Sequence, residues 1–251
     1  MARPRILLVE DDPAIQRFTQ LAVEDLPLDL LTASSVADAL ALLAEGPVRL
    51  VLTDLMLPGE SGQVLLQRLR EQPALAAGAR LAVYSAGLNP RVRAALEPLG
   101  VWRLLDKPVP LQALRRCVED ALAEQPASAT GAAPAPPPGA GATAAQAIAT
   151  YFGGNESLYR SYLRACLAQF PHDADAGAAA LRAGDLAALH RLAHSLKSVL
   201  RTLGQGAAAD TARALESATA KADAPAMQAH WLALEATLRQ SPDPRSGTSD
   251  S

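Results

Sequence analysis

The chain has 251 residues, and at about 150 residues per domain this length predicts one or two domains that each bury their own core. Its 23 Lys and Arg against 26 Asp and Glu give a net charge of −3, which argues against general nucleic-acid binding, because binding a phosphate backbone usually needs a basic surface. The cysteines, Cys117 and Cys166, lie in helix-like stretches and are predicted to be small apolar helix residues rather than a disulfide. No apolar run approaches the roughly 20 residues of a membrane span, so we expect a cytoplasmic protein without membrane insertion.

A segment rich in Ala, Pro and Gly divides the chain at residues 125–143. Such a composition cannot bury a core and predicts a flexible tether. It separates an N-terminal domain, residues 1–124, from a C-terminal domain, residues 144–240. The polar end of the chain, residues 241–251, is predicted to be a disordered tail.

The N-terminal domain alternates short apolar runs with amphipathic stretches. The apolar runs predict strands at residues 6–9, 28–31, 50–52, 81–84 and 101–105. The amphipathic stretches predict helices at residues 13–26, 35–45, 61–72, 89–99 and 110–124. Repeated strand-then-helix units predict an α/β fold, namely a (βα)5 doubly wound parallel sheet with helices on both faces.

The C-terminal domain shows no strand pattern. Its helices are predicted at residues 144–152, 155–183, 186–203, 207–221 and 225–239. Asp185 is a good N-cap for the third of these and Gly204 a good stop, whereas Pro171 is placed to kink or divide the second. Short connections between such helices predict an antiparallel, all-α bundle.

The ionisable and hydroxyl residues of the N-terminal domain gather where its strands end. These are Glu10, Asp11 and Asp12 after the first strand, Asp54 after the third, Ser85 after the fourth and Lys107 after the fifth. Parallel strands end at one edge of the sheet, so these side chains are expected to converge there. Carboxylates that converge repel one another and need a cation, and oxygen ligands favour Mg²⁺. A carboxylate beside such an ion, an ammonium and a hydroxyl is suited to accept a phosphoryl group.

The sequence around these residues resembles the receiver domain of bacterial response regulators. The resemblance covers residues 5 to about 122 and rests, in order and spacing, on residues 6–13 (ILLVEDDP), residues 52–62 (LTDLMLPGESG), Ser85-Ala86, and Gly100 followed by Lys107-Pro108. It implies a flavodoxin-like sheet with the strand order 2-1-3-4-5.

The resemblance also implies roles for individual residues. Asp54 is the implied phosphoacceptor. Glu10 and Asp11 form the acidic pair that holds Mg²⁺, with Asp11 the more direct ligand, and Asp54 and the backbone carbonyl of Met56 complete the protein's ligands. Ser85 is implied to bond the phosphoryl group and Lys107 to pair with it.

Asp12 is left open at this point. It precedes Pro13, and it is either a further member of the acidic group or simply the cap of the first helix.

One position departs from the receiver pattern. These domains usually carry Tyr or Phe three residues before the lysine, where the ring helps to transmit phosphorylation to a partner surface, but here the residue is Leu104. We therefore expect phosphorylation to survive and the output to be weaker or different. Trp102, two residues earlier, is expected to point to the same face as Leu104 without filling its place.

In the C-terminal domain, His190, His194, Lys197 and Arg201 recur at helical spacings of three and four and so share one helix face. Two histidines four residues apart can ligate a metal, but their neighbours are basic and no third ligand is apparent. A neutral imidazole with Lys197 ready to neutralise a phosphoryl group is instead a suitable phosphoacceptor.

Residues 193–198 (AHSLKS) resemble the histidine-phosphotransfer (HPt) domain, and residues 151–155, 183–185 and 215–216 are also similar to that family. The resemblance covers about 144 to 240 and implies a helical bundle in which His194 is the phosphoacceptor and Lys197 assists it. Ser198 stands where the family usually has glycine, and its small side chain is expected to allow a receiver to dock.

Together the two resemblances imply a two-component phosphorelay protein rather than an enzyme. Asp54 would accept a phosphoryl group from a sensor histidine kinase or an HPt partner, and His194 would exchange one with a receiver. The implied partners are thus kinases, receivers and HPt proteins, with no nucleic acid, because no basic recognition helix follows the linker.

Two alternatives remain open. In the first, the receiver is a regulatory binding module that gates access to the HPt domain, with little direct transfer between Asp54 and His194. In the second, the protein is a Mg²⁺-dependent phosphohydrolase with Asp54 as nucleophile, which is disfavoured because Leu55 and Met56 follow Asp54 instead of a nearby catalytic acid.

Overall fold

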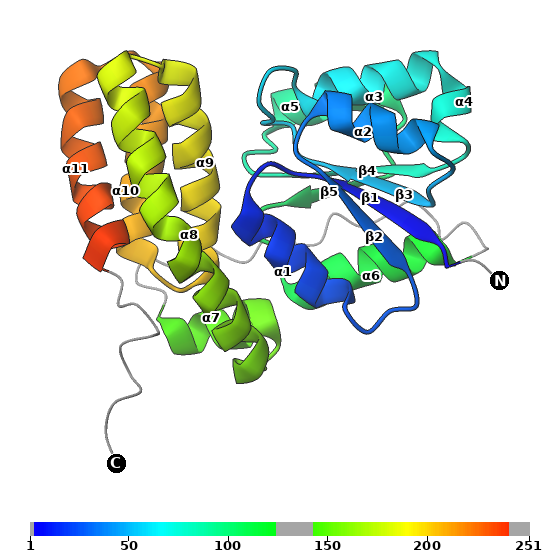
Figure 1. The fold of residues 1–251 in the computed structure, drawn as a ribbon, viewed down its shortest axis with the longest axis horizontal. Coiled ribbons are helices and arrows are strands. Elements are labelled where there is room, and N and C mark those ends of the chain that lie inside the picture. Colours follow the sequence, from blue (N-terminus) through cyan, green and yellow to red (C-terminus); the bar gives the residue numbers. More distant parts are fainter. Residues whose placement is uncertain (1–2, 124–142, 241–251) are drawn as a thin grey trace. The chain divides into compact units, whose positions relative to one another are not determined.

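The computed structural model describes residues 3–123 and 143–240 (Figure 1). The predicted tail at 241–251 and the predicted linker at 125–143, except for Thr143, lie outside these residues. The fold divides into two compact units, Met1–Pro136 and Pro137–Ser251.

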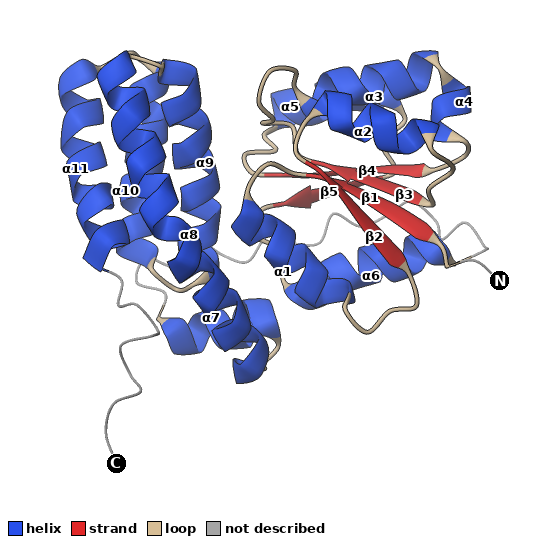
Figure 2. Cartoon of the chain, viewed as in Figure 1, coloured by secondary structure: helices blue, strands red, loops and turns tan. Residues whose placement is uncertain are grey.

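The first unit is built around a five-stranded parallel sheet (Figure 2). Its strands are β1 (Arg5–Val9), β2 (Asp29–Ala33), β3 (Leu50–Thr53), β4 (Arg80–Ser85) and β5 (Arg103–Asp106). Their order is β2-β1-β3-β4-β5, which confirms the implied order of the flavodoxin-like sheet. Every residue of β3 is buried, as a central strand covered on both faces requires.

Helices cover both faces of the sheet. They are α1 (Pro13–Val23), α2 (Val36–Ala44), α3 (Gly62–Glu71), α4 (Pro73–Ala76), α5 (Pro90–Leu96), η1 (Glu97–Leu99) and α6 (Leu111–Leu122). Helices α1 and α6 lie on one face and α2 to α5 on the other (Figure 2). The core under α2 to α5 includes Leu7, Val51 and Val83, which alternate along their strands with residues that face α1 and α6.

Several predicted elements differ from the structure at their ends; the first helix, for example, ends at Val23 instead of residue 26. The helix expected at 89–99 ends as an α-helix at Leu96 and continues as the 3-10 turn η1, because Pro98 has no N–H for a further α-helical hydrogen bond. The fifth strand begins at Arg103, two residues later than expected. Trp102 therefore precedes the strand, and strand alternation does not place its side chain.

The second unit is all-helical. Its helices are α7 (Ala144–Phe152), α8 (Glu156–Ala183), α9 (Leu186–Thr202), α10 (Gly206–Ala220) and α11 (Ala224–Gln240). Helices α8 to α11 lie side by side as the predicted bundle, and the short α7 packs against α8 and α9 (Figure 1). Asp185 caps α9 by accepting a hydrogen bond from the Ala188 N–H, and Gly204 follows α9 with φ +77°, as predicted.

The core of the bundle depends on one close approach between helices. Trp231 of α11 is fully buried, and its ring lies so near Gly177 of α8 that a Cβ there would sit 2.0 Å from the ring. Helix α8 is not divided at Pro171. Phe170 and Ala174 on either side of that proline are buried, so packing holds the helix together.

Candidate functional site

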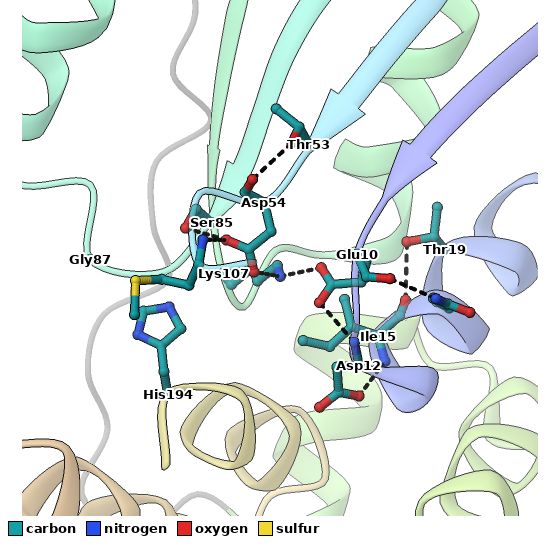
Figure 3. A network of polar contacts seen from close by, with 12 residues as sticks. Glu10, Asp12, Ile15, Thr19, Thr53, Asp54, Ser85, Gly87, Lys107 and His194 are labelled. Atoms are coloured by element: carbon teal, nitrogen blue, oxygen red, sulfur yellow. Dashed lines mark hydrogen bonds and ion pairs between the residues drawn. The ribbon is translucent and has the colours of Figure 1, made fainter. Parts of the chain in front are cut away.

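The first candidate site lies at the carboxyl edge of the sheet. Backbone hydrogen bonds continue past the strand ends there: the Asp54 N–H donates to the Val9 carbonyl at 2.9 Å, and the Lys107 N–H donates to the Ser85 carbonyl at 3.0 Å. These bonds bring Ser85, the last residue of β4, and the residues that follow β1, β3 and β5 into one place. The structure thus assembles Glu10, Asp54, Ser85 and Lys107 at one edge (Figure 3).

Both carboxylate oxygens of Asp54 are held by donors. Lys107 Nζ donates to Oδ2 at 2.6 Å, while Ser85 Oγ at 2.6 Å and the Met56 N–H at 3.1 Å donate to Oδ1. The same Lys107 Nζ donates to Oε2 of Glu10 (Figure 3). Lys107 is therefore shared between two buried carboxylates.

Burial and pairing set the charge of this cluster. Burial alone would raise the pKa of Asp54, but the Lys107 ammonium and the Ser85 and Met56 donors lower it below its usual range. Burial raises the pKa of Glu10 well above its usual value, although Lys107 opposes the shift. Burial also opposes the Lys107 charge, and the attraction of Asp54 and Glu10 more than offsets it and raises the pKa of the ammonium. Asp54 and Lys107 are thus charged at neutral pH.

The two remaining acidic residues behave differently. Asp12 is the N-cap of α1, and its Oδ1 accepts hydrogen bonds from the backbone N–H groups of Ala14 at 2.8 Å and Ile15 at 3.1 Å. Asp11 is half-buried, and burial raises its pKa to about 6. Asp12 thus caps the helix, and its charge also raises the pKa of Glu10 and Asp11, so the cap does not remove it from the acidic group.

The donor set suits a hard cation. Glu10, Asp11 and Asp54 place three carboxyl groups against the single ammonium of Lys107, and carbonyl and carboxylate oxygens are the ligands that Mg²⁺ prefers. Among residues 3–123 and 143–240, no group of three or more His, Cys, Asp or Glu side chains is already arranged around one point. Lys107 joins Glu10 to Asp54 in this structure.

Hydrogen bonds to backbone carbonyls hold the loop after Asp54 in place. The Gly62 N–H donates to the Leu55 carbonyl at 3.2 Å, and Thr53 Oγ1 donates to the Asp54 carbonyl at 2.8 Å. A Cβ on Gly62 would lie 1.8 Å from that carbonyl oxygen, so only glycine allows α3 to begin this close to Asp54.

The aromatic side chains near β5 do not take the usual receiver place. Leu104 is partly buried and packs against the core under α2 to α5. The ring of Trp102 lies instead against the guanidinium groups of Arg80 and Arg103, with distances of 4.8 and 4.2 Å to the ring centroid. Both arginines bind Asp120 of α6, so contacts with charged groups place this indole.

The second candidate site is the face of α9 that packs on α10. Nδ1 of His194 lies 2.6 Å from Oε1 of Glu216, and Lys197 Nζ donates to Oε2 of the same carboxylate at 2.6 Å. Burial would raise the pKa of Glu216, but hydrogen bonds from His194 and Lys197 lower it to about 2. Glu216 is therefore an anion that joins the two sequence-predicted residues.

The carboxylate also sets the tautomer of the imidazole. An anionic Glu216 can only accept, so Nδ1 of His194 carries the proton. Nε2 has no hydrogen-bond partner among the described residues. In the neutral imidazole the lone pair is thus on Nε2, a buried atom, and this is the nitrogen that would act as the nucleophile.

The other polar residues of this face also contact α10. His190 Nδ1 lies 2.8 Å from Thr219 Oγ1, and the Thr219 hydroxyl donates to the Glu216 carbonyl, so His190 is the donor in that pair. Arg201 pairs with Asp210 at 3.4 Å. The sequence did not predict that Glu216 contacts His194 and Lys197, because residues 215–216 were noted only as part of a resemblance.

A family model of the response regulator receiver domain matches residues 6–119, and one of the Hpt domain matches residues 161–242. The chain is 34% identical to the response regulator protein PilR of Pseudomonas aeruginosa over 122 residues, which cover 49% of this chain and 27% of PilR. It is 28% identical to the virulence sensor protein BvgS of Bordetella pertussis over 225 residues, which cover 84% of this chain and 18% of BvgS.

Among solved structures, the signal receiver domain of an HD domain-containing protein from Pseudomonas fluorescens Pf-5 is 30% identical, with a TM-score of 0.45, and the match covers 49% of this chain and 88% of that one. None of the helices in the described ranges is both long and apolar enough to cross a membrane.

Both family resemblances seen in the sequence are confirmed. The chain contains a response regulator receiver domain, matched over residues 6–119, and an Hpt domain, matched over residues 161–242.

Proposed function

We propose that Asp54 is the phosphoacceptor of the receiver domain and His194 that of the Hpt domain. The observation that carries the proposal is the way Asp54 is held, with Lys107 on one oxygen and Ser85 and the Met56 N–H on the other. These donors keep the nucleophile ionised and stand where they can also bind the oxygens of an incoming phosphoryl group.

In the receiver step, an Asp54 oxygen attacks the phosphorus of a phosphohistidine. A P–O bond forms, the P–N bond breaks, and its electron pair returns to the donor imidazole. Lys107 and Ser85 then bind phosphoryl oxygens while the Met56 N–H stays on the acceptor side chain. Glu10, Asp11, Asp54 and the Met56 carbonyl are the proposed Mg²⁺ ligands, and the ion would neutralise charge on the phosphoryl oxygens.

In the Hpt step, Nε2 of His194 attacks the phosphorus of an aspartyl phosphate on a receiver. A P–N bond forms, and the acyl P–O bond breaks with its electron pair on the leaving carboxylate. Glu216 accepts from Nδ1 at 2.6 Å and offsets the positive charge that the imidazole gains. Lys197 is held by the other Glu216 oxygen and follows His194 by three residues, so the two side chains are neighbours on the helix surface. Lys197 would therefore pair with a phosphoryl group on His194.

We further propose the domain limits 1–124 and 144–240, joined by a tether at 125–143 and followed by a tail at 241–251. The partners would be sensor histidine kinases and other receiver or Hpt proteins in the cytoplasm, without nucleic acid. The similarity to BvgS, a sensor protein by name, supports this choice. The receiver would assist only its own phosphorylation and dephosphorylation.

A second function is favoured by Leu104. Without an aromatic ring at this position, the receiver has no side chain of the usual kind to report phosphorylation to a partner surface. We therefore keep the alternative in which the receiver gates access to the Hpt domain, with little direct Asp54-to-His194 transfer.

Phosphotransfer from a panel of histidine kinases tests both functions. Wild type, Asp54→Ala and His194→Gln are labelled in the presence and absence of EDTA, and the domains are separated by cleavage at an inserted protease site within residues 125–143. We expect alkali-labile label on the receiver, lost in Asp54→Ala and with EDTA, and alkali-stable label on the Hpt domain, lost in His194→Gln. His190→Gln is the matched control and should be labelled like wild type.

The outcomes are distinct. Label that passes from Asp54 to His194 within one chain supports the relay. Two results together support gating. The label on the receiver never reaches His194, and the labelling of the Hpt domain by a separate receiver changes when Asp54 is phosphorylated. Receiver label that survives in Asp54→Ala contradicts the assignment of the acceptor.

A further inference from the structure

Tyr84 is an aromatic contact of Lys107 that the receiver resemblance does not assign. It lies in β4 directly before Ser85, it is 3% exposed, and Lys107 Nζ lies 4.8 Å from the centroid of its ring. The ammonium thus has two carboxylates, Glu10 and Asp54, and one aromatic ring around it. Such a distance is within the range of cation–π attraction, which is stronger at desolvated sites.

Tyr84 does not substitute for the missing aromatic at Leu104. In the β4–β5 register Leu104 pairs with Val83 and Tyr84 pairs with Leu105. Successive strand residues face opposite sides of the sheet, so Leu104 lies on the side of α2 to α5 and Tyr84 on the side of α1 and α6. The two positions act on different faces, and only Tyr84 contacts the lysine.

The ring is suited to hold a cation because it stays neutral. Burial raises the pKa of the Tyr84 phenol. A neutral ring presents its negative face to an ammonium without adding a charge to an edge that already has an excess of carboxylates. Because Lys107 is a flexible side chain shared between two acceptors, the ring also limits the volume in which its end can move.

We propose that Tyr84 is a positioning residue that holds the Lys107 ammonium at the Asp54 carboxylate. The proposal deepens the function above and rests on Asp54 being the phosphoacceptor. It predicts that removing the ring, but not the hydroxyl, displaces Lys107 and slows phosphoryl transfer to Asp54.

The contact itself is measured without metal or phosphoryl donor. The chain has only three lysines, Lys107, Lys197 and Lys221, so ε-¹³C-lysine labelling of the full chain gives a simple spectrum, and Lys107→Arg assigns its signal. We expect the Lys107 ε-protons to be shifted upfield by the Tyr84 ring in wild type and in Tyr84→Phe. The shift should vanish in Tyr84→Leu and in Tyr84→Met, a second ring-free variant of similar volume and different shape. An unchanged Lys107 signal in the ring-free variants overturns the contact.

The functional step is measured with acetyl phosphate as donor. We expect Tyr84→Phe to be phosphorylated within about twofold of the wild-type rate and the ring-free variants to be about three- to tenfold slower. In a Lys107→Gln background the same ring-free substitutions should have no further effect. An equal loss in both backgrounds means that Tyr84 acts only through packing, and overturns the proposal.

Different results would contradict the assignment of Asp54 and the positioning role of Tyr84. If wild type and Asp54→Ala are labelled alike, the assignment of Asp54 is wrong, while the ring-current experiment still reports on the contact. If labelling depends on Asp54 but Tyr84→Leu is as fast as wild type, the proposed function stands and the positioning role of Tyr84 is wrong.

Discussion

Oε1 of Glu216 lies 2.6 Å from Nδ1 of His194, across the contact between α10 and α9. The carboxylate fixes which ring nitrogen carries the proton, and it does so while its other oxygen holds Lys197. Glu216, which lies outside the run at residues 193–198, therefore positions both the imidazole of His194 and the ammonium of Lys197.

The first prediction concerns this residue. Glu216→Ala removes the hydrogen bonds of the carboxylate to His194 and Lys197. Since a hydrogen bond to a charged group contributes roughly 1.5–3 kcal/mol, phosphotransfer to His194 should slow about tenfold or more. The measurement is the rate of label transfer from a phosphorylated receiver. Asp210→Ala, on the same helix and paired with Arg201, is the matched control and should transfer at nearly the wild-type rate. Equal rates in both variants would remove Glu216 from the mechanism.

The second prediction concerns acid unfolding of the Hpt domain. The pKa of Glu216 is lowered from 4.5 to about 2 by its partners, so the folded state favours the charged form. Its ion pairs should stabilise the bundle fully above about pH 4.5, and this contribution should fall as the pH drops toward 2.

Denaturant unfolding checks the pH dependence. In a Trp102→Phe background, Trp231 is the sole tryptophan and reports on the bundle. The difference in unfolding free energy between this protein and its Glu216→Gln variant should be largest at neutral pH and shrink as the pH falls below about 4. A difference that stays constant down to pH 2.5 would contradict the depressed pKa.

The third prediction concerns the loop behind Asp54. Gly62→Ala places a Cβ against the Asp54 carbonyl oxygen, and relief of such overpacking typically costs about 1–3 kcal/mol. Receiver stability and the rate of Asp54 phosphorylation should both fall. Ser61→Ala is the neighbouring control, because Ser61 makes no side-chain cap hydrogen bond. Its stability and phosphorylation should stay near wild type, and a similar loss in both variants would refute the steric explanation.

The fourth prediction separates a helix cap from a metal ligand. Asp12→Ala should destabilise the receiver by about 1 kcal/mol through loss of the α1 cap, whereas Asp12→Asn should keep the cap. Asp11→Asn should instead weaken Mg²⁺ binding by about tenfold or more with little change in the cap. Isothermal titration with Mg²⁺ and thermal unfolding of the three variants provide the two readouts. Stronger loss of Mg²⁺ affinity in Asp12→Asn than in Asp11→Asn would reverse the two roles.

Much of the fold follows from local sequence signals. Buried parallel strands such as β3 are short apolar runs, and helix ends at Asp185 and Gly204 carry their own caps. The strand order came from the family resemblance, since alternating strands and helices alone allow several orders. Pro171 shows the limit of a local rule, because packing in the bundle outweighs the lost hydrogen bond.

The candidate sites also contain residues that the sequence predicts and residues that it does not. Glu10, Asp54, Ser85 and Lys107 were found from their places after strands, and the structure brings them together. Tyr84 and Glu216 depend on contacts between elements far apart in the chain, for which the sequence has no local pattern. For Glu216 the available signal was the resemblance of residues 215–216 to the Hpt family, which does not name the partner of the carboxylate.

The polar contacts between α9 and α10 have a consequence for how this Hpt domain tolerates change. His190 meets Thr219, His194 and Lys197 meet Glu216, and Arg201 meets Asp210, so the two helices are fixed against sliding along their whole contact. A slip by one helical turn, about 5.4 Å, would separate every pair at once. The short connection at Leu203–Gln205 should therefore be a poor place for inserted residues, even though it is a loop.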